Sequence, residues 1–416
     1  MFAVLKNTSF RYMFLGRFVT NIGDSLYFVA AMWLVFDLTN NPVYSGIASA
    51  VIMIPQSLQF LIGPLIDRWN LSKIMVNTQL IQSFLIFIIP LAYFLNILNV
   101  WLVIAVMFLA VTIEQFVYPA HYAAMPRLLE KKQFVSGNSL LTVSQQGSDF
   151  ILTGLSGLLL IYFGAINIYL LDSLTFLLAA FLFKMIKFPK EKTIEKPKII
   201  SLNDSFTNYK NDFKEGISVI KNSLIPKILF PLLISNLLFG VLNAVLPAYS
   251  NYRGGELFYG YYLSSMAAGM LIGSLLASRV EKFSFGKLMM FNFTFMFSFW
   301  FAAGTVSNSY LSVVLFGITL IPLGISNVLI FSLFQTIIPQ ELLGRAETII
   351  SSITSLSLPI GAIFGGILAN KIGVDVVFTS GALSGVFLLI YWALSKDLRS
   401  LPILNNMNDK KYFNAS

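Results

Sequence analysis

Runs of about 20 apolar residues recur along the whole sequence, separated by short polar or turn-forming stretches. A helix that crosses the hydrocarbon core of a bilayer needs about 20 such residues, and a backbone in lipid must satisfy its hydrogen bonds within the segment. Hydrophobic residues make up 56% of the chain and charged residues 11%, whereas soluble domains carry roughly 25% charged residues. The sequence therefore predicts an all-α integral membrane protein.

Turn-forming residues divide the apolar sequence into twelve predicted transmembrane helices. They cover residues 12–36, 43–66, 74–96, 100–124, 138–163, 165–186, 224–250, 257–280, 287–306, 310–336, 346–369 and 375–395. Four parts follow from this division: an N-terminal six-helix bundle (1–186), a cytoplasmic basic linker with an amphipathic helix (187–223), a C-terminal six-helix bundle (224–395) and a cytoplasmic tail (396–416).

Basic residues lie almost entirely on one predicted side of the membrane. All 28 Lys and Arg residues, apart from Arg17, Arg253 and Lys371, fall near the N-terminus, in the connections after even-numbered helices or near the C-terminus. Cytoplasmic loops carry such an excess of positive charge. We therefore expect both termini in the cytoplasm, and we read the net charge of +9 as topological, with no nucleic-acid partner.

The two predicted bundles resemble each other in sequence. Pro126 follows the fourth helix and Pro339 follows the tenth, 213 residues later. A glycine–arginine stretch after the second helix, beginning at Gly63, returns in altered form at Gly273. Such duplication is typical of two parallel halves that hold a substrate between them near the membrane midplane.

Pairs of glycines four residues apart indicate close helix packing. Small residues with this spacing allow the backbones of two membrane helices to approach each other. The pairs are Gly269 and Gly273, Gly361 and Gly365, and Gly381 and Gly385.

A short charged loop joins the second and third predicted helices. Its pattern, Gly63-x-x-x-Asp67-Arg68 followed by a lysine, resembles the loop signature of the major facilitator superfamily. The resemblance implies that Asp67 approaches the start of the eleventh helix, where Arg345 and Glu347 would pair with Asp67 and Arg68. These residues would then form a gate on the cytoplasmic side. The alternative is that the basic residues serve topology alone.

Three further segments narrow the resemblance. The stretch 116–126, Gly23-Asp24 and Gly344-Arg345 are similar to the macrolide-efflux and siderophore-export branch of the superfamily. The resemblance implies export from the cytoplasm driven by proton influx. One departure is that the arginine many relatives carry in the fourth helix is missing, since the stretch around Ala110 is apolar.

Ionisable side chains inside the predicted helices are the candidate functional residues, because each costs about 2.5–3.5 kcal/mol to place at the bilayer centre on insertion scales. Arg17, Asn21 and Asp24 are spaced by four and three residues, so they share one helical face. Asp24 is either a carboxylate that binds protons or contacts a cation, or a structural residue bonded to other helices.

Other polar residues extend this set. Glu114, flanked by Gln115 and one turn from Tyr118, could bind substrate or couple protons, or could serve helix packing. Asp149 has the same two interpretations. His121 titrates near neutral pH, but a lone histidine in a helix is more often a packing residue. A further acid, Asp172, lies nearer the outer end of its helix, and we interpret it as structural or as a helix-end acid.

Several functional classes are excluded by what the sequence lacks. It has no phosphate-binding loop of the ATPase type, no cysteine and no cluster with metal-ligand spacing. We predict no enzyme activity and no cofactor other than a proton gradient.

The sequence thus predicts a monomeric, multi-pass transporter of the bacterial cytoplasmic membrane that exports a bulky amphiphilic small molecule by proton antiport. The substrate would be an antibiotic such as a macrolide, or several drugs. A siderophore or related metabolite is the alternative within the same fold. A non-transporting membrane sensor or a partner of an ATPase is a more distant one.

Overall fold

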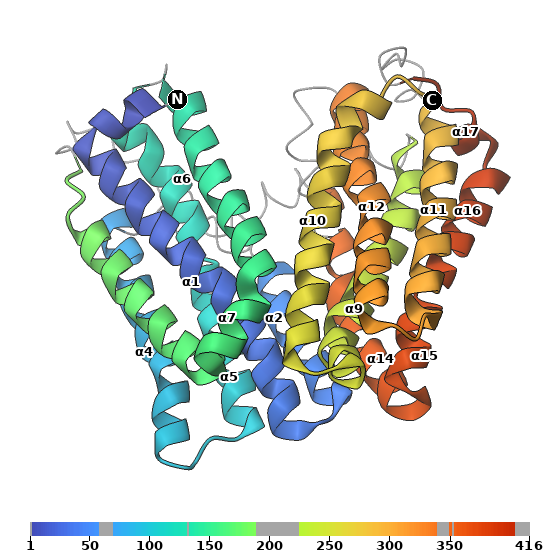
Figure 1. Ribbon diagram of the computed structural model, residues 1–416. Coiled ribbons are helices and arrows are strands. Elements are labelled where there is room, and N and C mark those ends of the chain that lie inside the picture. The colour runs from blue at the N-terminus through green and yellow to red at the C-terminus, as the bar shows by residue number, and fades with distance from the viewer. Residues whose placement is uncertain are drawn as a thin grey trace, which may run out of the picture. The chain divides into compact units, whose positions relative to one another are not determined.

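The computed structural model describes residues 2–57, 70–130, 133–188, 224–338, 349–351 and 353–403. Within these ranges the chain is helical apart from short connections, as Figure 1 shows. Contacts between residues divide the chain into two units. Unit 1 comprises residues 1–40 and 51–200, and unit 2 comprises residues 41–50 and 201–416. The prediction placed the whole helix 43–66 in the N-terminal bundle, whereas residues 41–50 belong to unit 2.

Unit 1 is built around two long helices that pack against each other, α1 and α7. Its helices are η1 (Phe2–Lys6), α1 (Thr8–Thr39), the later part of α2 (Pro42–Ser57), α4 (Leu71–Phe94), α5 (Val100–Glu114), α6 (Val117–Leu128) and α7 (Phe134–Lys184). The helix α4 packs on both α7 and α5. Asparagine side chains cap the N-termini of three of these helices. Asn7, Asn70 and Asn99 each accept a hydrogen bond from an N–H group in the first turn of α1, α4 and α5, respectively.

Two interruptions divide the helices of unit 1. The predicted helix 100–124 is not continuous, because α5 ends at Glu114 and α6 begins at Val117. Pro119 has no backbone N–H to bond the carbonyl of Gln115, and it lies in the first turn of α6, where proline is tolerated. The second interruption is Gly164, whose φ of 70° and ψ of 156° are not helical. It lies between the predicted helices 138–163 and 165–186, as expected.

Unit 2 contains eight described helices beyond the first part of α2. They are α9 (Ile225–Arg253), α10 (Glu256–Val280), α11 (Phe285–Thr305), α12 (Ser309–Ile337), α14 (Ser357–Ile372), α15 (Val374–Ser380), α16 (Leu383–Leu394) and α17 (Lys396–Arg399). The pairs α10 with α12, α9 with α14 and α11 with α16 lie side by side. The predicted helix 375–395 is divided into α15 and α16 near Gly381.

Close helix contacts in unit 2 occur at the predicted glycines. A Cβ atom on Gly269 or Gly273 would collide with a backbone carbonyl of α12, and one on Gly361 would collide with the carbonyl of Leu237 in α9. The predicted packing role of these glycines is confirmed. Their lack of a side chain sets the distance between the helices.

The end of unit 2 lies beyond the predicted boundary at residue 395. Leu398 and Leu401 are fully buried in the unit's core. The N–H groups of Phe285 and Gly286, at the start of α11, donate to the carbonyls of Pro402 and Leu401 at 3.1 and 3.2 Å. The first residues of the predicted tail therefore cap α11, because helix starts carry N–H groups without partners in their own helix.

Within the described residues, nine helices are long and apolar enough to cross a membrane, and two more apolar helices are shorter. The predicted class, an all-helical membrane protein, is confirmed. The count of twelve crossings and the cytoplasmic position of both termini stay predictions.

Candidate functional site

The polar face of α1 contains an ion pair inside unit 1. A guanidinium nitrogen of Arg17 lies 3.9 Å from Oδ2 of Asp24, and the two side chains are 3% and 18% exposed. Asn21, on the same face, lies 3.4 Å from the hydroxyl of Ser144 in α7. The expected common face is thus confirmed for Arg17 and Asp24, and it is directed toward other helices of the unit.

Asp172 packs against this face from α7. Its side chain is 1% exposed, and one carboxylate oxygen accepts a hydrogen bond of 3.1 Å from Thr175. The other, Oδ2, has no hydrogen-bond partner among the described residues. A Cβ atom at Gly23 would collide with Asp172 and Thr175, so the absence of a side chain there lets α1 and α7 meet. Asp172 lies inside α7 and not at a helix end, and its packing against Gly23 fits the alternative interpretation of a structural residue.

The side chain of Tyr27 lies near three acidic residues of unit 1. Its ring stands edge-on to that of Tyr169, with centroids 5.6 Å apart, and its hydroxyl is within electrostatic range of Asp24, Glu114 and Asp172. Glu114 is the last residue of α5, at the interruption before α6. We name Asp24, Glu114 and Asp172 the acidic cluster. Its members do not form a metal-binding group, and no such group occurs within the described ranges.

A chain of hydrogen bonds runs beside the acidic cluster from α1 to α5. The hydroxyl of Thr20 lies 2.9 Å from Oε1 of Gln79, whose amide donates to Gln82 at 3.1 Å. The amide of Gln82 in turn reaches the carbonyl of Ala110 at 3.4 Å. The sequence analysis missed Tyr27, Gln79 and Gln82, although the spacing of two glutamines by three residues in an apolar helix was a usable signal.

The remaining predicted site residues are placed less centrally. His121 is 3% exposed and packs edge-on against Phe183 at 5.1 Å, and its ring nitrogens have no hydrogen-bond partner among the described residues. The side-chain amide of Gln115 donates to the carbonyl of Val111 at 3.0 Å, so it helps to end α5. Both observations fit a packing role, although His121 lies within electrostatic range of Arg17.

Other predicted residues cannot be placed at the site. The side chains of Tyr118 and Asp149 lie outside the described part of the structure. The same holds for the whole predicted gate, which consists of Gly63, Asp67, Arg68, Arg345 and Glu347.

A helical membrane protein with ionisable side chains inside a helix unit is typical of a transporter. The chain matches the family described as "Transmembrane secretion effector" over residues 1–414. It belongs to this family, a branch of the major facilitator superfamily, and is thus a multi-pass membrane transporter and not an enzyme.

Relatives and a solved structure agree with this assignment. The chain is 23% identical to the uncharacterized MFS-type transporter YvqJ of Bacillus subtilis (94% of each chain covered). It is 25% identical to macrolide efflux protein A of Streptococcus pyogenes (93% of this chain, 96% of the relative). It is also 25% identical to the putative bacilysin exporter BacE of Bacillus subtilis (89% and 92%). The fold matches that of the nucleoside transporter NupG with a TM-score of 0.67 at 11% identity, covering 92% of this chain and 98% of NupG.

Proposed function

We propose that this protein exports a bulky amphiphilic small molecule from a bacterial cell, across the cytoplasmic membrane, in exchange for protons. The observation that carries the proposal is the Arg17–Asp24 ion pair inside unit 1, with Glu114 and Asp172 in electrostatic range of the same Tyr27 hydroxyl as Asp24. Carboxylates in a membrane interior are costly and are used as proton relays in transporters. The relatives named macrolide efflux protein A support an antibiotic as the substrate.

The Arg17–Asp24 pair suggests how proton binding and substrate binding could exclude each other. While Asp24 is ionised, its charge is held by Arg17. Protonation removes the negative charge and weakens the pair, and a cationic group on a substrate would compete for the same carboxylate. Glu114 and Asp172, on two other helices, would pass the proton onward. The proposed transporter works as a monomer, with twelve helices and both termini in the cytoplasm.

The test is uptake into inside-out membrane vesicles under an imposed pH gradient. The compounds are a macrolide, a lipophilic cation and an anionic siderophore. The variants are Asp24→Asn and Glu114→Gln. The matched control is Asp37→Asn, because Asp37 is an exposed acid near the C-terminal end of α1. We expect gradient-dependent accumulation of one compound in wild type and in the control, and at least a tenfold loss in the two cluster variants.

Two outcomes contradict the proposal. Accumulation that is equal with and without the gradient removes proton antiport. Accumulation of none of the compounds by folded protein favours a narrow substrate outside this panel or a non-transport role.

A second candidate is export of a siderophore or related metabolite, and the relatives named as putative bacilysin exporters favour it. The same vesicles distinguish the two candidates. Accumulation of the siderophore, or of bacilysin added to the panel, in preference to the macrolide would assign the protein to metabolite export.

A further inference from the structure

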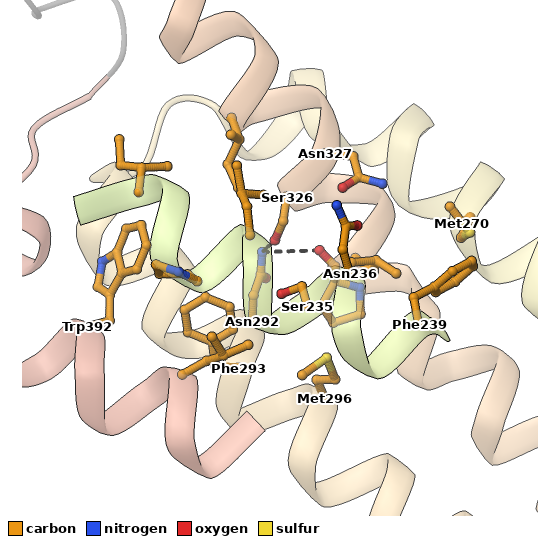
Figure 2. A pocket seen from close by; sticks show the side chains of 17 residues that line it. Ser235, Asn236, Phe239, Met270, Asn292, Phe293, Met296, Ser326, Asn327 and Trp392 are labelled. Atoms are coloured by element: carbon orange, nitrogen blue, oxygen red, sulfur yellow. Dashed lines mark hydrogen bonds between the residues drawn. The ribbon is translucent and has the colours of Figure 1, made fainter. Parts of the chain in front are cut away.

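Unit 2 contains a cavity of about 200 Å³ between its own helices. Figure 2 shows its lining, which comes from α9, α10, α11, α12 and α16. The residues used in the argument are Asn236, Phe239, Met270, Asn292, Met296 and Trp392. A smaller cavity of about 40 Å³ shares Phe239 and Met296 with it and extends to Trp300.

The lining of the larger cavity is uncharged. Its described residues include no Asp, Glu, Lys, Arg or His, and their polar groups are the amides of Asn236, Asn292 and Asn327, the hydroxyls of Ser235 and Ser326 and the indole N–H of Trp392. Removing a charged ligand from water without a countercharge is very costly. The cavity is therefore suited to a neutral ligand.

Several polar groups around the cavity are available for a ligand. The amide of Asn292 is held by donation to the hydroxyl of Ser326 at 3.1 Å, as a dashed line in Figure 2 marks. The side chains of Asn236 and Asn327 make no hydrogen bond within the described part of the chain. The indole N–H of Trp392, which is 1% exposed, and that of Trp300, which is 8% exposed, have no hydrogen-bond partner among the described residues. Buried donors without partners are uncommon.

The internal duplication allows the surroundings of the cavity to be compared with unit 1. Asn292 follows Gln79 by 213 residues, the same offset that separates Pro126 and Pro339. In unit 1 Gln79 belongs to the continuous chain of hydrogen bonds from Thr20 to the carbonyl of Ala110. At the matching place in unit 2, Asn292 borders open space.

We propose that this cavity binds an uncharged aromatic or alicyclic ring that carries a hydrogen-bond acceptor. Phe239, Phe293 and Trp392 supply ring faces and edges, while the asparagine amides and the indoles supply donors. An apolar cavity of about 150 Å³ holds a benzene molecule, so this cavity admits a larger ring or a ring with a carbonyl group. The proposal goes beyond the proposed function, because binding here needs no proton gradient and no acid.

The test is photolabelling of the full-length protein in lipid nanodiscs with benzophenone. This ketone is neutral, carries one acceptor and reacts preferentially with methionine. We expect saturable labelling of Met270 and Met296, mapped by mass spectrometry. Met289, which is buried in the same unit but does not line the cavity, should stay unlabelled. The matched anion 4-benzoylbenzoate and a trimethylammonium derivative of benzophenone should label Met270 and Met296 at least fivefold less.

Variants link the labelling to the cavity. Ser235→Phe places a ring inside it, and Ser298→Phe places the same ring on the exposed side of α11. We expect the first to reduce labelling of Met296 at least fivefold and the second to leave it unchanged. Asn236→Leu, a smaller change that removes one amide, should weaken labelling severalfold. Thermal unfolding shows which variants are folded.

Three outcomes overturn the proposal. The first is equal labelling by the charged analogues. The second is labelling that rises without saturation, as we expect at the exposed Met185. The third is undiminished labelling in folded Ser235→Phe and Asn236→Leu proteins. If Ser235→Phe does not fold, a competition experiment on the wild-type protein takes its place. Excess fluorenone, a neutral ketone of similar shape, should then reduce the labelling by benzophenone, and absence of competition overturns the proposal. Because no gradient is applied, these outcomes are independent of the vesicle transport test.

Discussion

Units 1 and 2 differ in where they keep their charges. In unit 1 Arg17, Asp24 and Asp172 lie within helices, with a guanidinium nitrogen of Arg17 lying 3.9 Å from Oδ2 of Asp24, and Glu114 ends α5 at the interruption before α6. In unit 2 the described ionisable residues lie at helix ends. Arg253, for example, ends α9 and donates to the carbonyls of Gly304 and Val306, which end α11. Lys227 and Asp397 pair at the opposite end, close to the starts of α9 and α17.

This difference suggests a division of labour between two related units. Charge inside unit 1 must be compensated within the unit, and the described residues there form an ion pair and a chain of hydrogen bonds. Unit 2 has no such requirement, and the corresponding region is a neutral cavity. Proton binding would then belong to unit 1 and recognition of uncharged ring systems to unit 2.

The largest expected effect comes from separating the ion pair. Arg17→Leu leaves Asp24 without this cation, and removing one partner of a buried pair costs about 3–5 kcal/mol. We expect a large fall in the free energy of unfolding, measured by SDS titration in detergent micelles. The double variant Arg17→Leu/Asp24→Leu removes both charges and should be more stable than Arg17→Leu alone. If the effect of the double variant equals the sum of the effects of Arg17→Leu and Asp24→Leu, the two residues are not a coupled pair.

The sequence was sufficient to predict features that depend on local spacing. Arg17 and Asp24 are seven residues apart, two helical turns, and their contact follows from the helix period. The break at Gly164 and the close approach at Gly273 also follow from the properties of glycine. Pro119 could have revealed the interruption before α6, but the apolar run 100–124 was interpreted as one continuous helix.

The sequence was insufficient where distant segments meet. Asp172 lies 149 residues after Gly23, and nothing in either segment indicates that they touch. The cavity of unit 2 was missed for a different reason. Its polar residues, such as Asn236 and Asn292, are neutral, so they do not stand out in an apolar helix as an acid does.

The second prediction tests whether the contact between α1 and α7 holds the acidic cluster together. Gly23→Ala would force Asp172 and Thr175 aside, and overpacking typically costs about 1–3 kcal/mol. Gly147→Ala is the matched control, because no atom lies within 4 Å of a Cβ at that position. We expect a lower thermal unfolding temperature for Gly23→Ala and no decrease for Gly147→Ala. Equal behaviour of the two variants would show that Asp172 is not held against Gly23.

The smallest effects compare the two amides related by the internal duplication. Gln79 accepts from Thr20 and donates to Gln82, whereas Asn292 borders a cavity. Hydrogen bonds between membrane helices are worth about 0.6 kcal/mol on average and about 1.7 at most. Gln79→Leu breaks one such bond, from Thr20 in α1, and one bond within α4, to Gln82, so we expect a loss of about 1–2 kcal/mol. Asn292→Leu should cost less than about 1 kcal/mol, because a side chain beside a cavity can adjust.

Unfolding by SDS measures both losses under the same conditions, and Ser298→Leu, on the exposed side of α11, controls for a new leucine in a helix. A loss for Asn292→Leu as large as that for Gln79→Leu would mean that Asn292 is as tightly held as its counterpart. The space beside it would then be a consequence of packing, and the contrast between Gln79, which is held by hydrogen bonds, and Asn292, which borders a cavity, would lose its functional meaning.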